Sequence, residues 1–497
     1  MARSSPFLLT LVVSAGLALG VSASRAAAQL PPVVFMEAVG GAGQRTDSTY
    51  REVTDSAKLA QYRRWLDNES ARFALTLYAD ARRIAREERH LALQPEAYYV
   101  ALVPGGNHAS VGFRLQTDSG TRDYPNAAYI LLDAEDWRFS TTLLHETGHM
   151  VLYVLAGGRV LPRRDLIPIS HSTAALTDRG TAFDEGFAIH LETVLAQIAT
   201  EPWLVNRYRH GQLLFGDQPG LMSEYYRQTS DLLTFSQTVG RYALVRDNNF
   251  AFEPAYTGPD YFRVQLEPSR DVAALRSADA LLQSEGFYAS FFFGLLMRGT
   301  RIPDSSALMV RERQALTALA DVFEHVPLTP GTPYLLHFLA AFARRFPANA
   351  AEADDVFLDL SHGVFMDADA EAVWRRHYLA AIRVDLAGLG RDSLNARRAR
   401  WREQLRTNPD IVFSRLGPQL RCEVANVPVR MLDEVAPLSF DANTAPEGVL
   451  RLVPGLSASG IAAWLRERSQ RPFTGWRDLV NRVPSVRRVA ARLRCDS

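Results

Sequence analysis

Five consecutive residues, His145 to His149, read His-Glu-Thr-Gly-His. On an α-helix the two histidines lie one turn apart on the same face, so both imidazoles can bind one zinc ion. Glu146 lies beside them, where its carboxylate can take a proton from a metal-bound water. The flanking run is apolar and free of proline, and Gly157 and Gly158 follow it, which favours the required helix. The pattern predicts a hydrolytic zinc site; the alternative is a buried helix whose two histidines bind only backbone or solvent.

A catalytic zinc takes three protein ligands and keeps a fourth position for water, so another ligand must come from later in the chain. The strongest candidate is Glu185, which lies in residues 183–190, where another helical segment is expected to begin. Gly186 and Ala188 are small enough for two helices to approach closely around an ion. A second Glu-Gly-Phe sequence makes Glu285 a rival ligand. The other role open to Glu285 is that of a helix-start carboxylate stabilised by the helix dipole.

Residues 95–195 resemble the gluzincin metallopeptidases, in which a glutamate on a later helix completes the zinc site. The resemblance rests on the His-Glu-x-x-His motif and on the Glu-Gly-x-Ala sequence at 185–188. It implies that His145, His149 and Glu185 bind zinc and that Glu146 is the general base. It favours Glu185 over Glu285, because the separation of Glu185 from His149 is closer to the family spacing.

The same resemblance implies a small sheet behind the motif helix, with an edge strand that aligns the substrate peptide. Extended runs at 98–103, 110–115 and 128–132 precede the motif, and either of the last two would be that strand. The thermolysin-like branch has an aspartate four residues after its glutamate ligand, which supports a zinc histidine. Ile189 occupies that position here. Asp184 could substitute for it, although a helix would point its side chain in a different direction.

The remaining catalytic group is left open by the sequence. Gluzincins use a tyrosine or a histidine to stabilise the oxyanion, and nothing in this sequence chooses among the available residues. Each of these, taken alone, is more typical of a surface or core position. The four candidates are His171, His190, Tyr256 and Tyr288.

The N-terminal segment, 1–28, has the composition of an export signal. Arg3 precedes an apolar core at 7–19, and three alanines at 26–28 form a small-residue cleavage site. The apolar core is too short to span a membrane, and no later stretch reaches the roughly 18 apolar residues that a span needs. We therefore expect export to the periplasm or beyond, with an uncleaved N-terminal anchor as the alternative.

Export makes a disulfide between Cys422 and Cys495, the only two cysteines, the expected pairing. This bridge would close a loop of about 73 residues and stabilise the C-terminal part by about 4 kcal/mol on the chain-entropy model. Two unpaired buried thiols are the alternative. The balance of 55 basic and 55 acidic residues gives no global charge argument for any partner.

The C-terminal end of the chain repeats a short turn sequence, Val-Pro-Gly-Leu at 453–456 and Val-Pro-Ser-Val at 483–486. This part resembles the tandem helix-hairpin-helix modules of competence DNA receptors and of minor pseudopilins of type II secretion. Residues 448–497 contain ten arginines and three acidic residues, which favours phosphate binding. Ser457 and Ser485, however, replace glycines that would let the backbone approach phosphate. Pseudopilins use the fold for protein packing, so the partner is a nucleic acid or a protein, with docking favoured.

These features predict an export signal at 1–28 followed by two functional parts. The first is a peptidase, with an α+β zincin-like catalytic core of a small sheet and active-site helices at 29–200 and a mainly helical extension at 201–407 that completes it. A linker at 408–437 leads to the second part, a small all-α helix-hairpin-helix domain at 438–497. The expected function is exported, zinc-dependent hydrolysis of peptide bonds in a peptide or protein substrate. A non-catalytic, zinc-stabilised binding or scaffold protein is one alternative, although a structural site needs no general base at Glu146. An extracellular DNA-binding protein is the other.

Overall fold

The computed structural model of the protein describes residues 30–39, 48–91, 93, 97–133, 140–162, 173, 175–198, 244–246, 248–253, 256–257, 262–264, 275–297, 305–367, 369–370, 372–373, 387–418, 420–431 and 434–495. The expected signal at 1–28 lies outside these ranges. Among the described helices, none is both long and apolar enough to cross a membrane.

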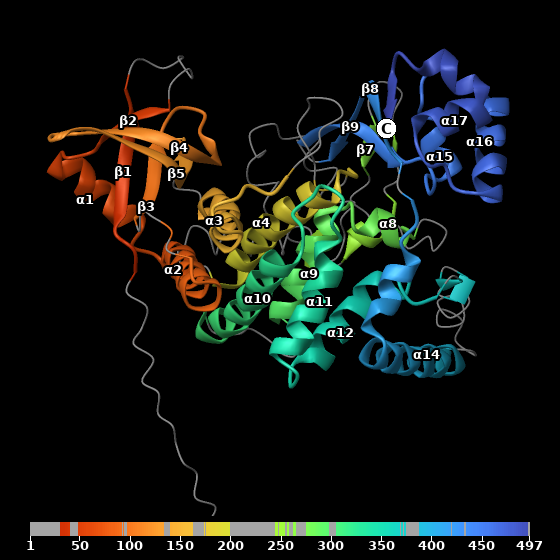
Figure 1. The fold of residues 1–497 in the computed structure, drawn as a ribbon, viewed down its shortest axis with the longest axis horizontal. Coiled ribbons are helices and arrows are strands. Elements are labelled where there is room, and N and C mark those ends of the chain that lie inside the picture. Colours follow the sequence, from red (N-terminus) through yellow and green to blue (C-terminus); the bar gives the residue numbers. More distant parts are fainter. Residues whose placement is uncertain are drawn as a thin grey trace, which may run out of the picture.

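A closed five-stranded barrel stands where the sequence predicts a small sheet (Figure 1). Each of the three extended runs predicted before the motif overlaps one of its strands, which confirms them as strands. The strands, in their order around the barrel, are β1 (Val33–Ala38), β2 (Thr49–Glu52), β4 (Asn107–Thr117), β5 (Gly120–Leu132) and β3 (Tyr98–Leu102).

Strand β4 changes its buried face half way along, at a β-bulge. Before the bulge, Ala109 and Val111 pack against the large core that includes the neighbouring helices, whereas after it Phe113 packs with the aromatic barrel core. Gly112 makes the change possible because its φ of +85° is in the region that favours glycine. A Cβ at this position would also lie 2.9 Å from the carbonyl oxygen of Pro125. The bulge thus lets one strand fill the barrel and also lie against the motif helix.

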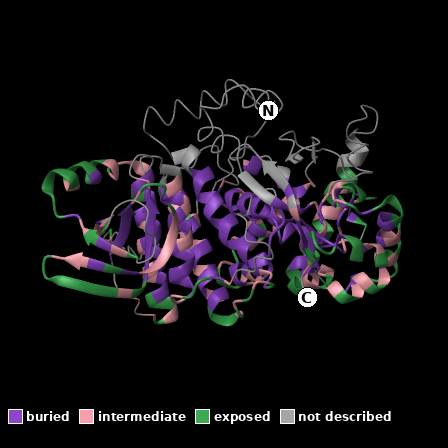
Figure 2. Ribbon diagram, turned by 90° about the horizontal axis from the view of Figure 1, so that it is seen from above, coloured by how far each residue is buried: buried purple, intermediate pink, exposed green. Residues whose placement is uncertain are grey.

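Helices form the centre of the molecule, and Figure 2 shows that buried residues concentrate there. In α9, every residue from Glu285 to Phe293 is buried, as expected for a helix that is apolar nearly all round. The principal helices are α1 (Ser56–Trp65), α2 (Glu69–Arg89), α3 (Ser140–Leu155), α4 (Arg179–Ile198), α9 (Glu285–Met297), α10 (Ser305–His325), α11 (Tyr334–Arg345), α12 (Ala350–Ser361) and α14 (Ala387–Thr407).

Much of the predicted helical extension at 201–407 is helical where the structure describes it, and it packs directly against α4. The contact is close at Gly186, where an added Cβ would lie 2.5 Å from the carbonyl oxygen of Glu285 and from Cβ of Tyr288. The extension therefore shares one hydrophobic core with α3 and α4. Residues 199–243 lie outside the described ranges.

The predicted linker at 408–437 is wrong, because most of this stretch is regular structure. It contains a 3₁₀ helix, η4 (Pro409–Arg415), followed by the antiparallel strands β8 (Arg421–Met431) and β9 (Glu434–Asp441). Leu420, Cys422 and Val424 are almost fully buried in a second core. A strand from the middle of the chain, β7 (Phe262–Val264), pairs with β8 as well.

The C-terminal domain is also not all-α as predicted, because its helices share that second core with β8 and β9. Its last strand, β10 (Leu493–Cys495), pairs with β8. The expected disulfide between Cys422 and Cys495 is confirmed, and it joins directly opposed positions of β8 and β10 with a Cα–Cα distance of 4.0 Å. The helical elements are α15 (Glu447–Leu450), α16 (Ala458–Gln470), α17 (Trp476–Arg482) and the 3₁₀ helix η5 (Pro484–Val489).

His362, the residue that ends α12, makes stability depend on pH. Burial, with a contribution from Arg398, lowers the pKa of His362 to about 4, against about 6.5 in an unfolded chain. As the pH falls from 7 to 4, the unfolded chain takes up a proton that the folded protein does not. The free energy of unfolding should therefore fall by up to about 3 kcal/mol through this group. We expect His362→Asn to remove that part of the pH dependence, because asparagine tolerates the left-handed backbone at φ 51°.

Urea unfolding of the metal-free protein between pH 4 and pH 7 measures this difference. His90→Asn is the matched control, since His90 ends α2 with φ 55° but is exposed. Equal pH dependence in His362→Asn and wild type would contradict the assignment.

Candidate metal centre

Helix α3 presents the two motif histidines on one face, as their spacing predicts. His145 Nε2 and His149 Nε2 lie 3.2 Å apart. Glu185, from α4, places its Oε2 atom 3.4 Å from each of these nitrogens. In the part of the chain that the structure describes, these three residues form the one group of histidine, cysteine or acidic side chains placed to hold a metal ion.

The spacing of the three atoms fits a tetrahedral metal. A tetrahedral zinc with bonds of about 2.0–2.1 Å holds its ligand atoms about 3.3 Å from one another. The observed separations of 3.2, 3.4 and 3.4 Å match this value. Two imidazole nitrogens and one carboxylate oxygen are also a ligand set typical of catalytic zinc. The residues present therefore fit the metal that the motif predicts.

Each histidine is oriented by a carboxylate on its other ring nitrogen. His149 Nδ1 lies 2.8 Å from Asp184 Oδ1, and His145 Nδ1 lies 2.5 Å from Glu192 Oε1. Such partners fix the tautomer that leaves Nε2 free to bind a metal. Asp184 thus supports a histidine from the position before the ligand. Glu192 was missed by the sequence reasoning; its signal is the spacing of seven residues from Glu185, two turns along the same helix face.

The electrostatics of this cluster favour a cation. Burial alone would lower the pKa of His145, but Glu192 and Glu185 outweigh it and raise the pKa to about 10. Burial is likewise outweighed at His149, where Asp184 and Glu185 raise the pKa well above its usual value. Two protonated imidazoles at the observed separation would repel each other, whereas a bound dication would neutralise the carboxylates and draw both nitrogens together.

Glu146, the predicted base, is buried between α3 and the barrel. Its Oε2 atom accepts a hydrogen bond from the backbone N–H of Ala109, at 2.6 Å. Burial is the main cause that raises the pKa of Glu146, which brings a carboxylate closer to the range useful for proton transfer near neutral pH. The hydrogen bond also shows that the backbone of β4 runs past the site with an N–H directed into it.

Two small residues allow α3 and α4 to approach closely enough to share an ion. A Cβ on Gly148 would lie 2.9 Å from Cα of Ala188, which is closer than real side chains allow. The glycine inside the motif is therefore required by packing. Behind it, the hydroxyls of Thr147 and Tyr98 lie 2.6 Å apart and tie α3 to strand β3.

The other candidate site residues lie elsewhere. Glu285 is buried at the start of α9, outside the three-residue metal group. His190 lies 3.4 Å from Glu312, and the ring of Tyr288 packs against Phe183; both side chains are fully buried. The two motif histidines are partly exposed. His190 and Tyr288 are fully buried, so neither lies on the solvent-exposed side of these histidines. His171 and the side chain of Tyr256 lie outside the described residues.

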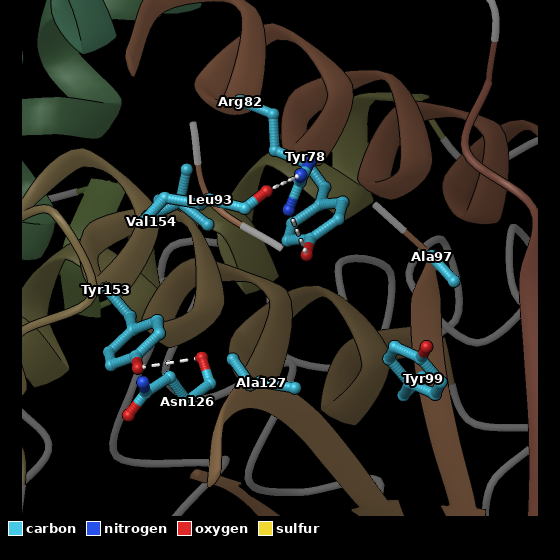
Figure 3. Close-up of a pocket in the computed structure, with 10 residues that line it drawn as sticks. Tyr78, Arg82, Leu93, Ala97, Tyr99, Asn126, Ala127, Tyr153 and Val154 are labelled. Carbon is cyan, nitrogen blue, oxygen red and sulfur yellow. Dashed lines mark hydrogen bonds between the residues drawn. The ribbon is translucent and has the colours of Figure 1, made fainter. Parts of the chain in front are cut away.

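A small cavity lies between α2, the barrel and the end of α3 (Figure 3). Its walls are braced by internal hydrogen bonds, among them Tyr153 Oη to the carbonyl oxygen of Asn126 at 3.0 Å and Arg82 Nη1 to Tyr78 Oη at 3.4 Å. Its volume of about 10 Å³ is roughly that of one water. We therefore interpret it as a packing feature and not as a substrate site.

In the turn between α15 and α16, Gly455 has a φ of +84°. The helix that follows it is capped internally, since Ser457 Oγ accepts the N–H of Gly460 at 3.2 Å. The serine thus uses an amide that a phosphate would otherwise bind. Whether this domain binds a nucleic acid or a protein stays a prediction.

Comparisons with protein-family models, with curated proteins and with solved structures find no match to this chain. The identification of the site therefore depends on its own residues. These are three converging metal-ligand atoms, a carboxylate behind each histidine and a buried glutamate beside them.

Proposed function

We propose that the protein is an exported zinc-dependent peptidase in which His145, His149 and Glu185 bind zinc and Glu146 is the general base. The observation that carries the proposal is the arrangement of the three ligand atoms, 3.2 to 3.4 Å apart, as tetrahedral zinc requires. The disulfide between Cys422 and Cys495 fits the oxidising compartment that export implies.

Each residue of the site has a defined task in this mechanism. Zinc, when bound, supplies a polarised water and a Lewis acid for the scissile carbonyl. Glu146 takes the proton of the attacking water on its carboxylate and delivers it to the leaving amine. Asp184 and Glu192 keep the two histidines in the orientation that binds the metal.

The edge of β4 offers a surface for an extended peptide. From Asn107 to Val111, β4 pairs with β5 alone among the described strands, because β2 pairs only farther along, at Arg114–Gln116. Ala109 lies within this edge and donates its backbone N–H to Glu146. A peptide added as a further strand would therefore pass the base. By contrast, residues 128–132, the other predicted edge, pair with β4 on one side and largely with β3 on the other.

A purely structural metal site is less consistent with this geometry. Structural zinc usually has four protein ligands and a closed coordination shell. Here three ligands converge within the described part of the chain, and both histidines are partly exposed. A buried glutamate beside the histidines has a use in hydrolysis but none in a scaffold.

The proposal is tested by metal content and by cleavage of a fluorogenic peptide library. We expect about one zinc per chain by elemental mass spectrometry. We also expect 1,10-phenanthroline to abolish cleavage, and added zinc to restore it. The isomer 1,7-phenanthroline, which does not chelate, is the matched control. A well-folded protein that contains no zinc and takes none up, or cleavage that survives full metal removal, would exclude a zinc peptidase.

A further inference from the structure

The helix that carries Glu185 begins at a residue held from two directions. Asp178, which precedes α4, accepts hydrogen bonds from the backbone N–H of Thr181 at 2.9 Å and from its hydroxyl at 2.7 Å. This is an N-cap, and it fixes the first turn of the helix. Asp178 is itself buried, with 8 % exposure, so the position of this cap depends on what surrounds it.

One of its neighbours comes from the C-terminal part of the chain, far away in the sequence. Arg421, at the start of β8, places Nη1 3.3 Å from the hydroxyl of Thr177 and 3.9 Å from Asp178 Oδ2. Its Nη2 lies 3.0 Å from Glu423 Oε1. Arg421 is buried, with 3 % exposure, and its guanidinium faces one carboxylate from the N-cap of α4 and one from β8.

A second buried link runs beside the first. Arg179, the first residue of α4, pairs with Asp279 at 2.6 Å. The other carboxylate oxygen of Asp279 accepts the backbone N–H of Gly417 at 2.9 Å, shortly before β8 begins. The start of α4 and the start of β8 are therefore joined twice, in each case through a buried arginine.

The disulfide fixes the strand that provides Arg421. Cys422 is the next residue along β8, and its bond to Cys495 holds β8 against β10. On the other side Arg421 is paired in register with Asp441 of β9. Arg421 thus lies in a five-stranded sheet that the disulfide cross-links.

Because α4 is one continuous helix, the placement of its first turn also determines where its metal-site residues lie. Glu185 is seven residues beyond Asp178, about 10 Å along a rigid helix, and Asp184 and Glu192 are on the same helix. We propose that Arg421 is a positioning residue for the metal ligands of α4, and that the Cys422–Cys495 disulfide supports the metal site by fixing β8. The inference rests on the proposed function, in that it requires a metal at His145, His149 and Glu185.

The principal test compares zinc affinity in Arg421→Met, Arg421→Lys and wild-type full-length protein by competition with a chromophoric chelator. Methionine keeps an unbranched stem but removes the guanidinium and the positive charge that faces the buried Asp178 and Glu423. We expect Arg421→Met to bind zinc at least 10-fold more weakly, as changes outside the ligand shell commonly do. Lysine should restore part of the loss, because its ammonium can still pair with a carboxylate. Arg487→Met, an exposed arginine on η5, is the matched control and should stay within about 2-fold of wild type.

Cobalt spectra separate positioning from general stability. Co²⁺ in the wild-type site has absorption bands that report its coordination, and we expect them to shift in folded Arg421→Met. A variant that is less stable but has unchanged cobalt bands and zinc affinity would overturn the proposal. If Arg421→Met fails to fold, Cys422→Ala/Cys495→Ala gives the same readout, with weaker zinc binding expected and unchanged binding contradicting the proposal.

A measurement on the wild type needs no variant. Because coupling between two sites is reciprocal, zinc binding should slow hydrogen exchange of the β8 amides. Unchanged exchange in β8, when α3 and α4 become protected, would overturn the proposal and leave the peptidase function intact. Absence of zinc binding by the wild type would instead mean that the proposed function itself has failed.

Discussion

Glu146→Gln is expected to reduce peptide hydrolysis by about 10³-fold, equivalent to about 4 kcal/mol of transition-state stabilisation, while zinc remains bound. Glutamine keeps the shape of the side chain and can still accept the N–H of Ala109 through its amide oxygen. It cannot take a proton from water. The ligand atoms of His145, His149 and Glu185 are unchanged, so the metal content should not fall. Cleavage rates and elemental analysis on the same preparation measure both parts of this expectation.

Asp184→Asn is the informative comparison, because its carboxylate contacts His149 and not the reacting atoms. We expect zinc affinity to fall by about 10- to 100-fold, with turnover largely recovered at saturating zinc. The two variants should therefore separate in opposite ways: one keeps metal and loses turnover, the other loses metal and keeps turnover when metal is supplied. Full activity in Glu146→Gln would remove this residue from the role of general base.

The parts of the fold that the sequence could predict are those set by local pattern. The motif helix follows from an apolar run without proline, and the strands before it follow from short β-branched and aromatic runs between turn residues. The pairing of Cys422 with Cys495 followed from there being only two cysteines. The helix and strand predictions use residues close in sequence, and the disulfide prediction has one possible partner for each cysteine.

The parts that failed depend on contacts between distant segments. Prolines such as Pro428 and Pro437 favour the prediction of a linker at 408–437, because proline is disfavoured inside strands. In the structure these two residues oppose each other directly after a register shift between β8 and β9, an irregular position of the kind where proline is tolerated. The role of Glu192 was hidden for a similar reason: only when α4 lies beside α3 does this carboxylate reach His145.

Gly148 and Gly186 show how packing resolves what spacing leaves open. Both are small residues beside metal-site residues, but Gly148 is required by α4 and Gly186 by α9. The sequence predicted a close approach of two helices around the ion. In the structure α4 packs between α3 and α9, with Ala188 against Gly148 on one side and Gly186 against Glu285 on the other. Helix α4, which carries Glu185, is consequently packed on two faces, against α3 and against α9.

Glu185→Ala is expected to lower zinc affinity by more than 100-fold, or more than about 2.7 kcal/mol, because a ligand is lost and only His145 and His149 remain. Glu285→Ala is the matched comparison, since both glutamates precede a Gly-Phe pair and both are buried on a helix. Zinc retained after dialysis against a weak chelator measures the difference, with circular dichroism to confirm that each variant is folded.

The two substitutions have different consequences for the site because the two side chains occupy different helices. Glu185 Oε2 is 3.4 Å from both imidazole nitrogens, so its removal opens one corner of the tetrahedron directly. Glu285 lies against α4 through its backbone carbonyl, next to Gly186. Its side chain can therefore be removed without loss of a metal ligand. Zinc lost from Glu285→Ala but retained by Glu185→Ala would transfer the third ligand to α9. In that case α4, with Asp184 and Glu192, would orient the histidines without binding the metal itself.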